Sequence, residues 1–153
     1  MRAISLWQPW ASAIALGAKR IETRSWSTTY RGPIAIHAAK RKRVHELVYL
    51  MQTPCFVEAL RPLYAISPNS RWIDAIELMP YGAIVATAML ADCLTVNDAL
   101  EKLITPLEYE LGNFEPDRFG WVLEDVKALA RPIPFKGKQG FFNVPDDCFT
   151  EAA

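Results

Sequence analysis

The sequence predicts an α+β fold in which five to six strands form a mixed β-barrel with helices around it. Three observations support this class. Apolar, strand-like segments recur at uneven spacing along the 153 residues, short helical patterns fall between some of them, and no regular helix follows each strand. A doubly wound parallel sheet needs such regular crossover helices, so that class is excluded. With 51% hydrophobic residues, we expect residues 1–153 to bury one core and to form a single domain.

The first quarter of the chain predicts a strand, a short helix and two further strands. Ala3–Leu6 is typical of a buried strand, and Pro9 lies near the first position of the following helix, where its missing N–H costs nothing. Gly17 is expected to end that helix at the C′ position. Charged and uncharged side chains alternate along Arg20–Arg24, which predicts a strand with the charges on one face. Pro33–His37 is expected to form the next strand after a turn.

The rest of the chain mixes short helical patterns with apolar strands. Helices are expected at 44–51, 55–60, 73–78, 96–103 and 106–111. Strands are expected at 83–93, 119–126, 132–135 and 140–144, with a turn at 136–138 and a loop at 66–72. Thr95 and Asp98 have the spacing of a capping box for the fourth of these helices.

Cysteine and histidine usage indicates a reducing compartment and no metal site. Cys55, Cys93 and Cys148 are an odd number, are scattered and include no C-x-x-C pair. His37 and His45 do not complete a metal-binding pattern with them. No apolar run approaches the ~18 residues of a membrane span, and the N-terminus does not fit a signal peptide. We therefore expect a cytoplasmic protein without a cofactor.

Charge is neutral in total but uneven along the chain. Seventeen basic residues balance seventeen acidic ones, which is weak support for binding bulk DNA. Residues 19–43 nevertheless contain eight basic side chains and one acid, Glu22, whereas 92–125 is acidic. The eight are Lys19, Arg20, Arg24, Arg31, Lys40, Arg41, Lys42 and Arg43. Such asymmetry can focus a positive field over one surface without net charge.

A family resemblance rests on five blocks in order, LWQPWASAIALGAKRIETRSW, RGPIAIHAA, GAIVATAMLADCL, FGWVLEDV and PIPFKGKQGFFNV. Together they resemble the ASCH family (activating signal cointegrator homology), a branch of the PUA-like superfamily. The resemblance covers about residues 2–145 and is least at 40–80. It implies a small PUA-like β-barrel with helices over one side and a cleft expected to bind RNA or other nucleic acid.

Lys19, Glu22 and Arg24 are the first candidates for chemistry. On a strand, Arg20, Glu22 and Arg24 share one face, which predicts a carboxylate held between guanidinium groups beside Lys19, unless the charges line a solvated edge strand. An amide-hydrolysing subset of the superfamily uses Lys, Thr and Glu, with the first two spaced K-x-x-T. Here Glu22 stands where that Thr would be, and Thr23 is one register step out. Lys19 and Glu22 are therefore catalytic candidates only if the protein is an enzyme.

The aromatic candidates are three tryptophans near the first helix. Trp10 and Trp26, beside turns and cationic residues, suit a rim on which a base stacks. Trp7 directly follows an apolar strand, so core filling is an equal alternative for it.

Polar candidates complete the expected nucleic-acid site. We expect Lys19, Arg24 and Arg31 to contact phosphate, and Gln8 and Glu22 to hydrogen-bond a base edge. Gln8 can instead help hold a phosphate at the helix start. His37 is either a structural, hydrogen-bonded residue or a cleft residue able to change charge near neutral pH.

These observations support three hypotheses. The first is a protein that binds RNA or other single-stranded nucleic acid in a basic cleft. The second is a hydrolase on the same ligands, a ribonuclease or an amidohydrolase of a modified nucleoside, and the third is a protein-interaction module. A deep closed pocket at Glu22 favours the enzyme, and an open basic groove favours binding.

Overall fold

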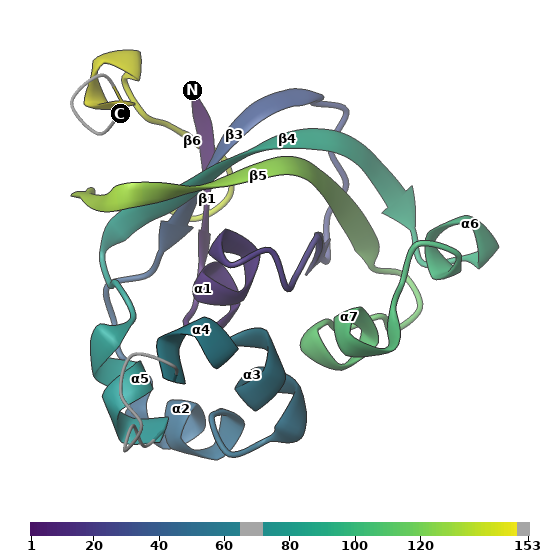
Figure 1. The fold of residues 1–153 in the computed structure, drawn as a ribbon. Helices are drawn as coiled ribbons and strands as arrows, with labels where there is room; N and C mark the ends of the chain where they lie inside the picture. Colours follow the sequence, from purple (N-terminus) through teal and green to yellow (C-terminus); the bar gives the residue numbers. More distant parts are fainter. Residues whose placement is uncertain (65–71, 150–153) are drawn as a thin grey trace.

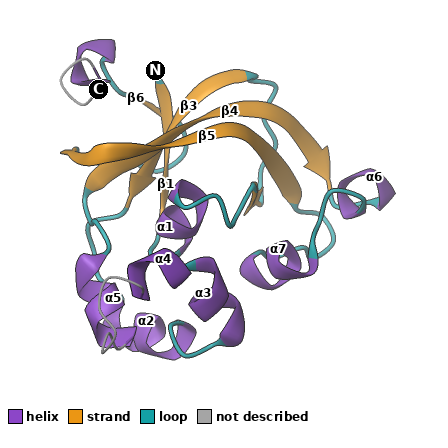
Figure 2. Cartoon of the chain, viewed as in Figure 1, coloured by secondary structure: helices purple, strands orange, loops and turns teal. Residues whose placement is uncertain are grey.

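The computed structural model describes residues 1–64 and 72–149 and shows a curved mixed sheet with most helices on one side of it (Figures 1 and 2). The sheet has six strands in the order β2-β5-β4-β3-β1-β6, which confirms the α+β class. Within the described residues β2 and β6 are two open edges, so the expected barrel is not closed. The loop expected at 66–72 lies outside the described residues, except that Trp72 begins a helix.

The strands pair in both directions. Their bounds are β1 Arg2–Leu6, β2 Ile21–Arg24, β3 Gly32–Ala38, β4 Ala83–Thr95, β5 Phe119–Pro134 and β6 Phe142–Asn143. β1 runs parallel to β3, and the other pairings are antiparallel. A parallel pair inside an otherwise antiparallel sheet makes the sheet mixed, as predicted.

β5 is longer than the sequence predicts, because it joins the strands expected at 119–126 and 132–135 into one. Its pairing with β4 slips at three places, between Ile84 and Ala86, Thr87 and Met89, and Leu90 and Asp92. Each slip interrupts the apolar–polar alternation from which strands are predicted in a sequence. The two long strands bend over the first helix (Figure 1).

Helix α1 (Trp10–Ala15) lies under the concave face of the sheet, and Gly17 ends it as predicted. Gly17 has φ +77°, which glycine adopts without strain. Its N–H donates to the Ile14 carbonyl (2.8 Å), and the Ala18 N–H donates to the Ala13 carbonyl (3.0 Å), which satisfies the last turn. Pro9 is the N-cap residue rather than the first helical one. Ile14 packs in the core formed with Ile36, Leu90, Trp121 and other sheet residues.

A second group of helices covers α1 from the other side (Figure 1). It comprises α2 Val44–Leu50, α3 Pro54–Ala59, α4 Arg61–Tyr64 and α5 Trp72–Leu78. Their apolar faces meet around Leu47, Phe56 and Ile76, and α1 contributes Ala13 to the same cluster. Helix α1 thus separates two cores, one with the sheet and one with the helices.

The remaining elements are α6 Asp98–Glu101, α7 Pro106–Leu111 and a 3-10 turn, η1, at Asp146–Phe149. The expected capping box is wrong in part, because Thr95 belongs to β4 and the Leu100 N–H instead donates to Asn97 Oδ1 (3.4 Å). At α7, Thr105 Oγ1 accepts from the Glu108 N–H (3.1 Å). Among the described helices, none is both long and apolar enough to cross a membrane.

Candidate functional site

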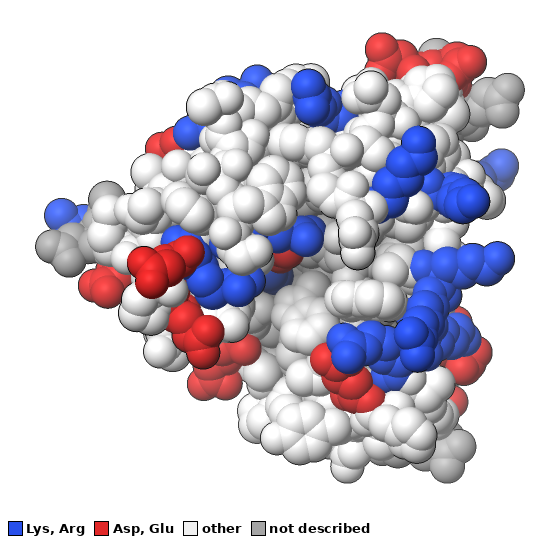
Figure 3. All heavy atoms as spheres, turned by 180° about the vertical axis from the view of Figure 1, so that it is seen from behind, with Lys and Arg blue, Asp and Glu red and all other residues white. Residues whose placement is uncertain are grey.

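A cleft lies where the carboxyl end of β1 meets α1 and the loop 135–140. Three adjoining cavities form it, and all three are lined by Ser5 and Trp7. We call them the floor cavity (about 320 Å³), the lysine cavity (about 970 Å³) and the middle cavity (about 480 Å³), and together the Trp7 cleft. The back of the molecule is hollowed, and Lys and Arg side chains gather beside the hollow (Figure 3).

The floor cavity brings Lys19, Glu22 and Arg24 together. Arg24 Nε lies 3.1 Å from Glu22 Oε1, and Lys19 Nζ lies 3.9 Å from Glu22 Oε2. Arg24 Nη2 also donates to the Ser5 carbonyl (2.9 Å), which ties β2 to the end of β1. The Glu22 carboxylate is therefore held between an ammonium and one guanidinium group. Arg20, expected as the second guanidinium, is exposed and forms no ion pair with Glu22.

A buried acid that the sequence did not single out, Glu108 on α7, completes this cluster. Glu108 is 4% exposed and accepts the backbone N–H groups of Arg20 and Ile21, both at 2.9 Å. Its Oε1 lies 3.7 Å from Lys19 Nζ, and Lys19, 1% exposed, also donates to the Ile21 carbonyl. Burying an ammonium is costly unless it is paired and hydrogen-bonded, and Glu108 provides much of that compensation.

Thr23 also borders the floor cavity, although alternation along β2 places it on the opposite face from Glu22. The cavity extends past the strand to Asn113, whose N–H donates to Thr23 Oγ1 (3.1 Å). The hydroxyl is thus tied to the connection that follows α7.

The three tryptophans all line the cleft but differ in how far their rings are open to it. Trp7 is 41% exposed, and the Arg43 guanidinium lies 5.3 Å from its ring centroid. Trp10 lines the floor cavity but is partly buried, with its Nε1 donating to the Leu111 carbonyl (2.9 Å). Trp26 lines the middle cavity and packs edge-on against Trp121, with ring centroids 4.6 Å apart. Trp7 therefore presents more open ring surface to the cleft than sequence reasoning expected.

Gln8 and Arg31 are engaged elsewhere. Gln8 is buried, with Nε2 donating to the Pro80 carbonyl (2.8 Å) and Oε1 accepting from the Ser12 N–H (3.0 Å). Arg31 Nη2 lies 2.6 Å from Asp92 Oδ1, outside the three cavities. The Cys93 N–H and this guanidinium lower the pKa of Asp92. Both predicted site residues thus have structural partners in this structure.

His37 is a buried wall of the lysine cavity. Its Nδ1 lies 2.9 Å from Ser5 Oγ and its Nε2 lies 3.0 Å from the Phe135 carbonyl, so a neutral ring satisfies both with one N–H. Burial lowers the pKa of His37, and the bond to Phe135 opposes this. Gly137 lies directly against the ring, because a Cβ there would come within 2.6 Å of His37 Nδ1. The imidazole therefore positions the 135–140 loop.

Three lysines, Lys40, Lys136 and Lys138, line the lysine cavity. In the part of the chain that the structure describes, none of them forms an ion pair with an acid. Lys42 and Arg43, by contrast, pair with Glu77 and Glu46. The unbalanced positive charge of the cleft therefore lies at the lysine cavity. Within residues 1–64 and 72–149, no group of His, Cys, Asp and Glu is placed to hold a metal ion.

Comparisons with known proteins agree with the resemblance of the sequence blocks. The family model described as "ASCH domain" matches residues 4–132. Two curated relatives, both called "Activating signal cointegrator 1", are 25% identical over 134 residues (Homo sapiens) and 28% identical over 135 residues (Mus musculus). Each match covers 88% of this chain but 20% of the relative, so the chain spans about a fifth of the length of these relatives.

Solved structures show the same fold. The crystal structure of ASCH from Zymomonas mobilis superimposes with a TM-score of 0.53 at 16% identity, covering 98% of this chain and 91% of that one. A mutant of the same protein gives a TM-score of 0.53 over 98% of this chain and 94% of its own. At this identity the likeness concerns the fold.

Proposed function

Because the chain belongs to the ASCH domain family, whose fold is PUA-like, we propose that it binds single-stranded nucleic acid, RNA above all, in the Trp7 cleft. The observation that carries the proposal is the position of Trp7. Its ring is 41% exposed at the point where all three cavities meet. A base stacked on such a ring gains ~1–3 kcal/mol with little dependence on sequence.

The charge of the cleft supports the same function. Lys40, Lys136 and Lys138 line its largest cavity without acidic partners in the described structure, which suits a chain of phosphates. Tyr81 lies in the same wall, and burial together with Glu77 raises its pKa to about 12, so it stays neutral. A neutral phenol adds an aromatic surface without repelling the phosphates.

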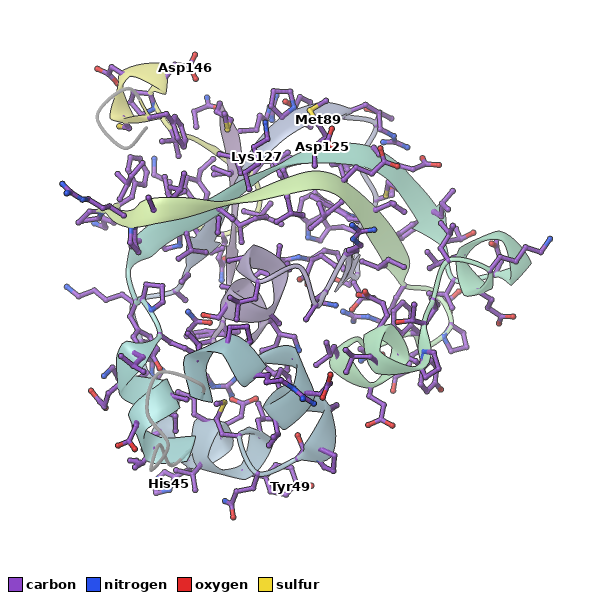
Figure 4. All side chains as sticks on the ribbon, viewed as in Figure 1. His45, Tyr49, Met89, Asp125, Lys127 and Asp146 are labelled. Carbon is purple, nitrogen blue, oxygen red and sulfur yellow. The ribbon has the colours of Figure 1, made fainter. Side chains whose placement is uncertain are left out.

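The test is the affinity of a labelled single-stranded RNA of about ten nucleotides, measured by fluorescence anisotropy. We expect Trp7→Ala to weaken binding by roughly 5- to 150-fold, the loss of one stacked base. Tyr49→Ala is the matched control, because Tyr49 is 72% exposed and lies at the far end of the helical part (Figure 4). Equal affinities for both variants and the wild type would refute the proposal.

A second candidate is hydrolysis of the bound ligand, as a ribonuclease or an amidohydrolase of a modified nucleoside. It is favoured by the buried Lys19 ammonium beside the Glu22 carboxylate in the floor cavity, an arrangement suited to proton transfer. The floor cavity adjoins the two wider cavities instead of forming a closed pocket, which favours binding. Chromatography of RNA and modified nucleosides after incubation decides this. Products that Lys19→Ala abolishes support an enzyme, and unchanged substrates contradict it.

A further inference from the structure

The cations at the floor of the Trp7 cleft are paired with acids, unlike the lysines of the cavity beside it. Lys19 and Arg24 are paired with the carboxylates of Glu22 and Glu108 at 3.1 to 3.9 Å, and a further acid, Glu110, lines the floor cavity. An added phosphate would find both cations already paired and would be repelled by the Glu22 carboxylate. The floor cavity therefore suits an uncharged group, and phosphates suit the lysine cavity.

The walls of the floor cavity suit a flat ring. Leu6, Trp10, Phe56 and Leu111 line it together with the charged side chains. Its volume of about 320 Å³ is within the usual range of small-molecule pockets. A nucleobase offers flat apolar faces to these walls and a polar edge to the charged group.

We propose that this cavity is a base pocket that selects guanine, with Glu22 as the residue that reads the base; this inference rests on the proposed function. An ionised carboxylate accepts hydrogen bonds at both oxygens and donates none. Guanine alone among the four RNA bases has two neighbouring donors, N1–H and the N2 amino group, on its Watson–Crick edge. Glu22 can accept both, and such charge-assisted, paired hydrogen bonds are strong and directional.

Lys19 and Arg24 hold the Glu22 carboxylate in place, with Lys19 Nζ 3.9 Å from Oε2 and Arg24 Nε 3.1 Å from Oε1. The other bases match this carboxylate less well. Adenine and cytosine offer a single donor beside an acceptor. Uracil offers one donor between two acceptors, so one oxygen of Glu22 would face an acceptor.

The test compares five labelled pentanucleotides that differ only in the middle base, guanine, inosine, adenine, cytosine or uracil, with uracil at the other positions. Inosine keeps N1–H and O6 but lacks the amino group, so it removes one hydrogen bond to a charged oxygen. We expect the guanine oligonucleotide to bind at least about tenfold more tightly than the inosine and uracil ones. These comparisons use the wild-type protein and do not depend on the folding of a variant.

The Glu22→Gln variant then assigns the preference to its residue. The amide that this substitution introduces would place a donor against a guanine donor, so the ratio of guanine to uracil affinity should fall to near one. Glu124→Gln, on an exposed part of β5, removes the same charge and should keep the ratio. Thermal melting of both variants shows whether they are folded.

The outcomes separate the two proposals. Equal binding of all five oligonucleotides, or preference for another base, overturns the guanine pocket but leaves the binding function in place if Trp7→Ala still weakens it. A guanine preference that survives in folded Glu22→Gln also overturns the role of Glu22. Absence of binding to every oligonucleotide overturns the proposed function and the inference with it.

Discussion

Replacing Glu108 by Ala should lower the free energy of unfolding far more than its place on a short helix suggests. The carboxylate accepts the backbone N–H groups of Arg20 and Ile21, at the start of β2, both at 2.9 Å, and lies 3.7 Å from Lys19 Nζ. Hydrogen bonds to a charged group each contribute ~1.5–3 kcal/mol, and removing one partner from a buried ion pair costs ~3–5 kcal/mol. These effects overlap, so we expect a loss of about 3–5 kcal/mol.

Urea denaturation followed by tryptophan fluorescence measures this loss. The control is Glu110→Ala, because Glu110 is an exposed acid on the same helix and should change the unfolding free energy by less than about 0.5 kcal/mol. Equal losses for the two variants would refute the view that Glu108 anchors β2 and compensates Lys19.

Three further predictions concern the cleft. Gly137→Ala should cost about 1–3 kcal/mol and weaken RNA binding, because its Cβ would come within 2.5 Å of Ser5 Oγ and 2.6 Å of His37 Nδ1; unchanged stability and affinity would contradict this. Burial lowers the pKa of His37 below its ordinary value of 6.5, so the unfolded chain takes up this proton first as the pH falls. Stability should therefore fall as the pH drops through 6.5, and less steeply in His37→Gln, with the exposed His45→Gln as control. RNA affinity should fall with salt at a log–log slope of roughly −0.7 per phosphate contacted, and a flat salt dependence would exclude the groove.

The parts of the fold that local residues determine were predictable from the sequence. The end of α1 depends on one residue, Gly17, whose positive φ is a property of glycine itself. The strand alternation at Arg20–Arg24 likewise brought Glu22 and Arg24 to the same cavity.

The length of β5 and the openness of the sheet depend on pairing between distant segments, which no local pattern contains. The register slips between β4 and β5 hide the alternation, and Asp125 adopts a positive φ of 47° within the strand. Figure 4 shows Met89, Asp125 and Lys127 along the outer side of these strands. A closed barrel, which the sequence pattern and the family resemblance predicted, requires hydrogen bonds between β2 and β6. In the part of the chain that the structure describes, these strands pair only with β5 and β1.

Sequence reasoning did not single out Glu108 and left Trp7 open between the core and the cleft. Thr105 and Glu108 have the spacing of a capping box, which predicts a solvated Glu, yet the carboxylate bonds to β2, 87 and 88 residues away. Glu108 lies one turn before the buried Leu111, on a helix whose inner face is otherwise apolar. This position is the sequence signal that indicates burial of Glu108. Trp7 continues an apolar run in the sequence, but β1 ends at Leu6 and leaves the ring in the connection to α1.

The location of bound RNA tests the account most directly. A single-stranded RNA containing 5-iodouridine, which crosslinks to nearby aromatic rings under ultraviolet light, can be bound, irradiated and mapped by mass spectrometry. Tyr49 and Tyr109, 72% and 64% exposed, are more accessible than Trp7 at 41%, so random encounters would favour them. The account predicts adducts at Trp7 and at Tyr81 in the lysine cavity. Adducts confined to Tyr49 or Tyr109 would contradict it.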